Sequence, residues 1–191
     1  VLAMKPVYRL PVLDLAMPAL RQISPRQYSQ LMNYISLLVR SDMKISLFEF
    51  ILQTIIDRRL APNFVKLRVK AKHSNVSQSK KDLAILLSAL AHSGHEDDKL
   101  AHKAFNEASS RLPKHLSGSA FIPRGNISFY TLKEAMVLFG GGEAAEKRIV
   151  LDACARCVLY DGIVTVEEAE LLRAVAYTLD LPLPPFLPKT V

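Results

Sequence analysis

The feature that most constrains the fold is an Asp-Gly turn at 161–162, which separates two apolar runs of helical spacing, 149–159 and 169–179. An Asp-Gly pair favours a tight turn, because glycine adopts backbone conformations that side chains disfavour. Thr165 and Glu168 then have the spacing of a capping box, in which each side chain accepts the other residue's backbone N–H. The sequence therefore predicts a helical hairpin with both ends of its turn specified.

The same pattern occurs earlier in the chain. Asp42, Ser46 and Glu49 repeat the spacing of the aspartate, the capping residue and the glutamate, although Met43 stands where the glycine would be. Neither copy can bury its apolar face alone, so we expect the two to share one core. The predicted fold class is an all-α helical bundle with two pseudo-repeated helix-turn-helix hairpins.

Apolar periodicity and helix-stop residues predict further helices at about 11–20, 80–92, 97–112 and 128–139. Pro18 is expected to kink or end the first of these, and Gly94 to cap the second. We expect a single domain over 1–191, with no better boundary than a basic loop. Its named parts are the first hairpin at 25–60, the basic loop at 61–80, the second hairpin at 143–180 and a proline-rich tail at 182–191.

Composition restricts the class of protein. No apolar run approaches the roughly 18 residues of a membrane span, so the fragment is expected to be soluble. Two cysteines do not make a secreted disulfide framework, which favours a reducing cytoplasmic compartment. The opening residues Val1-Leu2-Ala3-Met4 are not typical of a natural start, so we expect a piece of a longer protein.

The formal net charge of +7 is concentrated in one stretch, 58–81, which holds eight basic residues and no acidic one. Four of them alternate with apolar residues, a pattern that fits either a short edge strand or a solvated loop. These candidates for contact with an anionic membrane surface are Lys66, Arg68, Lys70 and Lys72. Nucleic acid is disfavoured, because only Phe64 and His73 could stack on bases there.

No complete catalytic signature is present. His95-Glu96 is followed by Lys99 where a zinc peptidase helix needs its second histidine, so the histidines near 92–95 are expected to be solvated. Cys154 and Cys157 have redox spacing but fall in mid-helix on an apolar face, which favours core packing. We expect neither enzymatic activity nor a bound cofactor in this fragment.

A weak divalent-metal site is one alternative for the turns. Asp161 and Glu168 match the fifth and twelfth positions of a calcium-binding EF-hand loop, although the other ligand positions are apolar. Asp42 and Glu49 would be the corresponding candidates in the first hairpin. The competing interpretation is that the aspartate accepts turn N–H groups and the glutamate caps the helix.

The pattern Asp-Gly-x-Val-Thr-x-x-Glu at 161–168, between two apolar helices, resembles the TerB-like (tellurite-resistance) helical domain. The wider pattern resembles the region after the peptidase domain in bacterial HtpX-like membrane zinc metallopeptidases. Its motifs are LPVLDLAMPALRQ at 10–22, LFE at 47–49, EAELLRA at 168–174 and PLPP at 182–185.

This resemblance implies a parent that is a zinc metalloendopeptidase anchored in the bacterial inner membrane, with the present chain on the cytoplasmic face. It also implies acidic metal-binding positions, which fall here on Asp161, Glu168, Asp42 and Glu49. We expect a non-catalytic accessory domain that contacts a protein partner or the parent's own peptidase domain. The alternatives are a divalent-metal-sensing module and a basic module that binds an anionic membrane surface.

Overall fold

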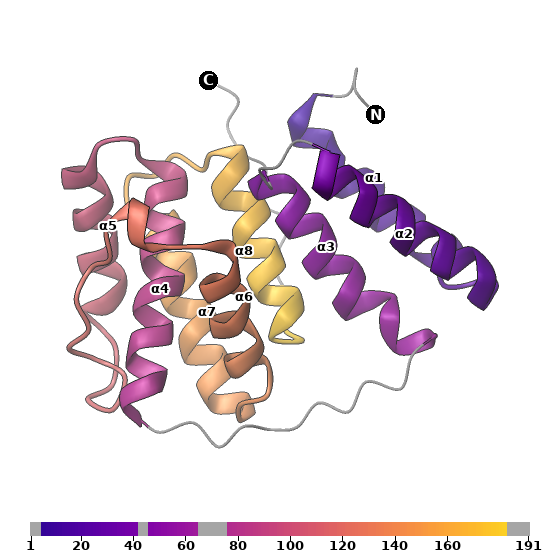
Figure 1. Cartoon of the computed structure of the whole chain (residues 1–191). Coiled ribbons are helices and arrows are strands. Elements are labelled where there is room, and N and C mark those ends of the chain that lie inside the picture. Colours follow the sequence, from indigo (N-terminus) through magenta and orange to yellow (C-terminus); the bar gives the residue numbers. More distant parts are fainter. Residues whose placement is uncertain (1–4, 42–45, 65–75, 183–191) are drawn as a thin grey trace. The chain divides into compact units, whose positions relative to one another are not determined.

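The computed structural model describes residues 5–41, 46–64 and 76–182. All regular secondary structure in these ranges is helical, which confirms the predicted fold class (Figure 1). Contacts divide the chain into two compact units, 1–68 and 69–191. The prediction of one domain over the whole chain stays a prediction.

The first unit contains three α-helices, α1 (Arg9–Leu20), α2 (Pro25–Ser41) and α3 (Leu47–Arg59), with short 3₁₀ turns at Pro6–Tyr8 and Ala61–Asn63. Capping side chains mark the starts of two of these helices, and the Ser46–Glu49 cap confirms the predicted one. The Ser24 N–H donates to Oε1 of Gln27 at 2.8 Å, and the Ser46 N–H donates to Oε2 of Glu49 at 2.8 Å. Local sequence therefore sets where α2 and α3 begin.

Side-chain contacts connect the helices of this unit. Arg59 of α3 forms an ion pair with Asp14 of α1, at 2.8 Å between the nitrogen and the oxygen. The Tyr28 and Phe64 rings stack with centroids 4.5 Å apart, which joins α2 to the chain just after α3. Pro18 lies in the last turn of α1, and the helix ends two residues later, as expected of a helix-breaking residue.

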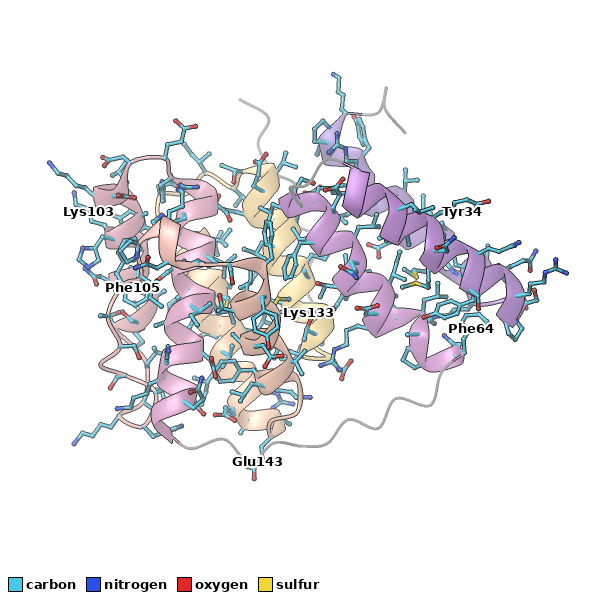
Figure 2. All side chains as sticks on the ribbon, viewed as in Figure 1. Tyr34, Phe64, Lys103, Phe105, Lys133 and Glu143 are labelled. Carbon is cyan, nitrogen blue, oxygen red and sulfur yellow. The ribbon has the colours of Figure 1, made fainter. Side chains whose placement is uncertain are left out.

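The second unit contains α4 (Val76–Gly94), α5 (Asp98–Ser109), α6 (Phe129–Gly140), α7 (Ala144–Val158) and α8 (Val166–Thr178), with a 3₁₀ turn at Arg124–Asn126. α4 is the central helix, because it packs against each of the other four (Figure 1). Every residue from Asp82 to His92 is buried. α5 has a buried face, which includes Phe105, and an exposed face, which includes Lys103 (Figure 2).

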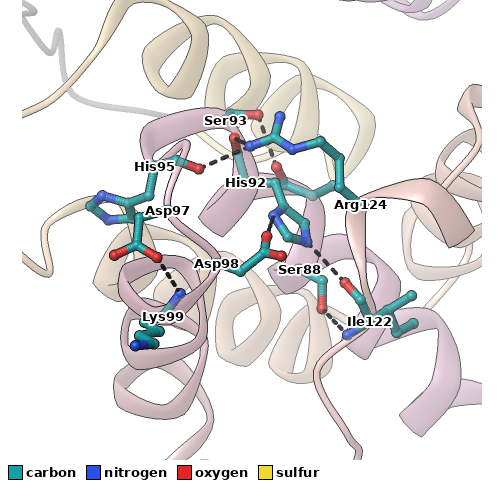
Figure 3. Close-up of polar contacts among 10 residues, drawn as sticks. Ser88, His92, Ser93, His95, Asp97, Asp98, Lys99, Ile122 and Arg124 are labelled. Atoms are coloured by element: carbon teal, nitrogen blue, oxygen red, sulfur yellow. Dashed lines mark hydrogen bonds and ion pairs between the residues drawn. The ribbon is translucent and has the colours of Figure 1, made fainter.

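The connection from α5 to α6, residues 110–128, is irregular but fastened along α4 (Figure 3). Hydrogen bonds join Ser119 Oγ to the Lys80 carbonyl at 2.7 Å and the Ile122 N–H to Ser88 Oγ at 3.0 Å. We call residues 110–128 the α5–α6 segment. Among the described residues, no helix combines the length and apolar character that a membrane crossing requires.

Candidate functional site

The turn between α7 and α8 has the local geometry that its sequence predicts. Gly162 has a φ of 76°, a left-handed conformation that favours glycine. Oδ1 of Asp161 accepts the Ile163 N–H at 2.9 Å, and the Gly162 N–H donates to the Leu159 carbonyl at 3.3 Å. The predicted role of Asp161 as a turn acceptor is therefore confirmed.

The capping box that starts α8 is also present. The Thr165 N–H donates to Oε2 of Glu168 at 2.9 Å, and the Glu168 N–H donates to Oγ1 of Thr165 at 3.2 Å. The Thr165 hydroxyl donates to the same carboxylate oxygen at 2.9 Å. Glu168 is thus fixed by three hydrogen bonds with a single partner, and its predicted capping role is confirmed.

Glu168 differs from an ordinary capping residue in its burial. Its side chain lies against Gly94, the last residue of α4, and a Cβ at that position would stand 1.9 Å from Oε1. Only 2% of Glu168 is exposed, and this burial raises the pKa of its carboxyl group. The hydrogen bonds from Thr165 and the nearby His95 oppose the rise, whereas Asp161 adds to it.

Two histidines near this junction are buried, so the expectation that they are solvated is wrong. His95 meets the Tyr160 ring edge-on, with centroids 6.2 Å apart, and His92 lies 4.8 Å from the Phe121 ring. The α5–α6 segment covers His92, whose Nε2 lies 3.0 Å from the Ile122 carbonyl oxygen (Figure 3). Sequence alone does not reveal that residues distant in the chain pack on each histidine.

The α5–α6 segment also caps α4. The Arg124 guanidinium donates to the carbonyl of His92 at 2.8 Å and to that of His95 at 2.9 Å (Figure 3). These carbonyls stand at the negative end of the helix dipole, where a cation is stabilising. Arg124 therefore satisfies two carbonyls at the C-terminal end of α4.

The other predicted site residues lie elsewhere. Glu49 caps α3 in the first unit, and Asp42 falls outside the described residues, as do Lys66, Arg68, Lys70 and Lys72. Within the described parts of the chain, no group of three or more His, Cys, Asp or Glu side chains could hold a metal ion. Of the predicted metal ligands that the structure describes, only Asp161 and Glu168 lie in the same turn. Divalent-metal binding stays a prediction.

The two cysteines pack in the core, as predicted. Cys154 is 0% and Cys157 1% exposed. Burial raises the pKa of the Cys157 thiol to about 12, with the Glu168 carboxylate adding to the rise, so a reactive thiolate does not form at neutral pH. The Cys157 Sγ donates to the Leu87 carbonyl at 3.6 Å, which attaches α7 to the central helix.

Sequence reasoning missed the exposed apolar surface of the α7–α8 turn. Leu159, Tyr160 and Ile163 are 48%, 36% and 44% exposed, although all three belong to or adjoin the apolar hairpin. Their position beside the Asp-Gly pair is the one available signal, since residues at a tight turn point away from the helix interface. We call these three residues the turn surface.

Comparisons of the chain with protein-family models, with curated proteins and with solved structures found no match.

Proposed function

We propose that this chain is a non-catalytic accessory domain that acts by protein–protein contact through the turn surface. The observation that carries the proposal is the exposure of Leu159, Tyr160 and Ile163 on a turn whose backbone is held by hydrogen bonds. A turn whose backbone is already ordered loses little backbone conformational entropy when its side chains bind a partner. Tyrosine in particular is enriched where interfaces concentrate their binding energy.

The partner we propose is the peptidase domain of the same parent protein, a zinc metalloendopeptidase anchored in the bacterial inner membrane. The order and spacing of the motifs between 10 and 185 support this parent. On this proposal the chain lies at the cytoplasmic face and supplies none of the zinc ligands. Its task is to position or regulate the catalytic domain.

The contact can be tested with a photo-crosslinking residue placed at Ile163 in the natural full-length protein. Val137 on α6 is a matched control, because it is 45% exposed and Ile163 is 44% exposed. We expect crosslinks from position 163 to peptides of the peptidase domain and none from position 137. Equal yields from the two positions, or crosslinks only within this chain, would contradict the proposed surface.

A separate assay tests the non-catalytic assignment. The purified chain should not cleave casein, because activation of a zinc-bound water needs a ligand set that the sequence lacks. Cleavage that a chelator abolishes would overturn this part of the proposal. The result does not depend on which surface binds the partner.

A further inference from the structure

Asp161 combines three properties that no other aspartate in the described parts of the chain combines. It is exposed, it lies outside the helices, and the residue that follows it, Gly162, has no side chain. The described aspartates that lie within helices are Asp14, Asp57, Asp82, Asp98 and Asp152. The remaining two, Asp97 and Asp180, precede residues that carry side chains.

The backbone after Asp161 leaves the next peptide nitrogen open to reaction. Gly162 has a φ of 76°, and a Cβ placed there would meet nothing within 4 Å. Its N–H donates to the Leu159 carbonyl at 3.3 Å, which is long for such a bond. After Asp180, by contrast, the Leu181 N–H donates to the Ala176 carbonyl at 3.0 Å. The Gly162 nitrogen is thus both unhindered and weakly held.

The Asp161 carboxyl group is kept close to that nitrogen. Its Oδ1 accepts the Ile163 N–H at 2.9 Å, so the side chain is folded back along the main chain. This hydrogen bond closes a ring of atoms that contains both the carboxyl carbon, Cγ, and the Gly162 nitrogen. The other carboxyl oxygen, Oδ2, accepts no hydrogen bond from the described residues, so none has to be broken for it to leave.

We propose that Asp161 is a site of spontaneous isoaspartate formation. The Gly162 nitrogen attacks Cγ of the protonated carboxyl group, and the proton of that nitrogen and the Oδ2 hydroxyl leave as water. A second water molecule then opens the succinimide ring. Opening at Cγ restores aspartate. Opening at the main-chain carbonyl carbon of Asp161 gives isoaspartate, in which the chain continues through Cγ and the former main-chain carboxyl group becomes a free carboxylate.

The modification alters the turn that joins α7 to α8. Isoaspartate adds one carbon to the main chain and removes the side-chain acceptor of the Ile163 N–H. The modified chain should therefore unfold at a lower urea concentration than the unmodified chain. The turn surface shifts with the turn, so the partner contact should weaken as the chain ages. This last consequence rests on the proposed function, whereas the reaction at Asp161 does not.

The test is storage of the whole 191-residue chain at mildly acidic pH and body temperature. Mass spectrometry of its peptides then locates isoaspartate by uptake of heavy oxygen from labelled water. Asp180 is the matched control, because it too is exposed and outside a helix. We expect isoaspartate to accumulate about tenfold faster at Asp161 than at Asp180, which corresponds to an activation barrier about 1.4 kcal/mol lower.

Two further samples test the parts played by the glycine and by the folded turn. Gly162→Asn introduces a residue that tolerates the left-handed backbone but places a side chain beside the nitrogen, so accumulation at Asp161 should fall about tenfold. Circular dichroism checks that this variant keeps its helical content. A synthetic peptide of residues 156–168 lacks the fold. It should react at most about threefold faster than the folded chain, because the turn already holds Cγ near the nitrogen.

Three outcomes would overturn the proposal. The first is equal accumulation at Asp161 and Asp180. The second is a folded chain that stays unmodified while the peptide reacts, which would mean that the turn protects Asp161. The third is unchanged accumulation in Gly162→Asn, which would show that the absent side chain is not the cause. Failure of crosslinking from Ile163 would contradict the proposed function alone.

Discussion

The capping boxes of α3 and α8 use the same chemistry in different surroundings. The glutamate N–H donates to the capping hydroxyl at 3.2 Å in both. Ser46 is exposed and Glu49 is half-buried, whereas Glu168 is 2% exposed and lies against Gly94. Residues close in sequence therefore form the cap in both cases. The packing of Glu168 against Gly94, which is distant in the chain, determines how much free energy is lost by burying the capping carboxylate.

The burial of Glu168 places one carboxylate between two helix ends of opposite sign. At the N-terminus of α8 its negative charge is stabilised by the dipole and by the Thr165 N–H. Beside Gly94, at the C-terminus of α4, the same charge is disfavoured. Glu49 in the box of α3 is only half-buried, so substitutions at the two boxes should differ in their effect on stability.

The largest effect is expected for Gly94→Ala. The new Cβ would stand 1.9 Å from Oε1 and 2.3 Å from Cδ of Glu168, so the buried carboxylate must shift and its hydrogen bonds with Thr165 are weakened. We expect the free energy of unfolding, measured by urea denaturation, to fall by about 3 kcal/mol.

Two further variants test the cause of that loss. Gly125→Ala is the control, since a Cβ there meets nothing within 4 Å, and its effect should be close to zero. In the double variant Gly94→Ala/Glu168→Ala the clash is gone, so the two losses should be clearly less than additive. Additive losses would mean that contact with Glu168 is not what excludes a side chain at Gly94.

The next effect concerns the two glutamates themselves. Glu168→Ala should lower the free energy of unfolding by about 2 kcal/mol, because it empties a buried site and leaves the half-buried Thr165 N–H without its acceptor. Glu49→Ala should cost about 0.5 kcal/mol, since water can replace the acceptor at exposed Ser46. Equal losses at the two positions would show that burial adds nothing to the cap.

A smaller effect is expected at the turn. Asp161→Ala removes the acceptor of the Ile163 N–H and should lower the free energy of unfolding by about 1 kcal/mol. The loss should be the same with and without calcium or magnesium. If either ion raised the melting temperature of the wild type and not of the variant, the metal-sensing alternative would replace the proposed function.

The smallest effect is a dependence on pH. Burial raises the pKa of folded Glu168 above its ordinary value of 4.5, so the folded state binds the proton more tightly than the unfolded chain. The contribution to stability is therefore full below pH 4.5 and declines as pH rises through the folded pKa.

Glutamine imitates the protonated side chain and should keep this contribution at neutral pH. Relative to wild type, Glu168→Gln should therefore gain stability between pH 4.5 and pH 7 in urea denaturation. Glu49→Gln provides the comparison in the exposed box. A Glu168→Gln profile parallel to wild type would show that the buried carboxyl group carries no pH dependence.

Much of the fold follows from local sequence. Capping pairs and apolar spacing predict every α-helix in the described residues, because caps satisfy backbone groups within one turn. The first and last residues of the helices are predicted less exactly. α4 begins at Val76 rather than near Lys80, and α5 ends at Ser109 rather than at Leu112. End residues depend on packing as much as on intrinsic preference.

The candidate site is less predictable, because its distinctive contacts join distant segments. Sequence indicates that Glu168 caps α8 but not that Gly94 admits its carboxylate. The sequence predicts Gly94 as a cap at the helix end, yet Gly94 is the last helical residue. Because it has no side chain, the Glu168 carboxylate fits beside it. His95 and Tyr160 likewise meet only through the packing of α4 beside the turn.

The hydrogen bonds that hold the α5–α6 segment to α4 have a consequence for digestion by proteases. Irregular connections are normally where proteases cut first, since they open without disturbing the helices. Here Arg124 is exposed, yet its guanidinium is held by the carbonyls of His92 and His95. Trypsin can bind that side chain only after both hydrogen bonds have broken, so the rate of cutting after Arg124 reports how often the α5–α6 segment detaches from the end of α4.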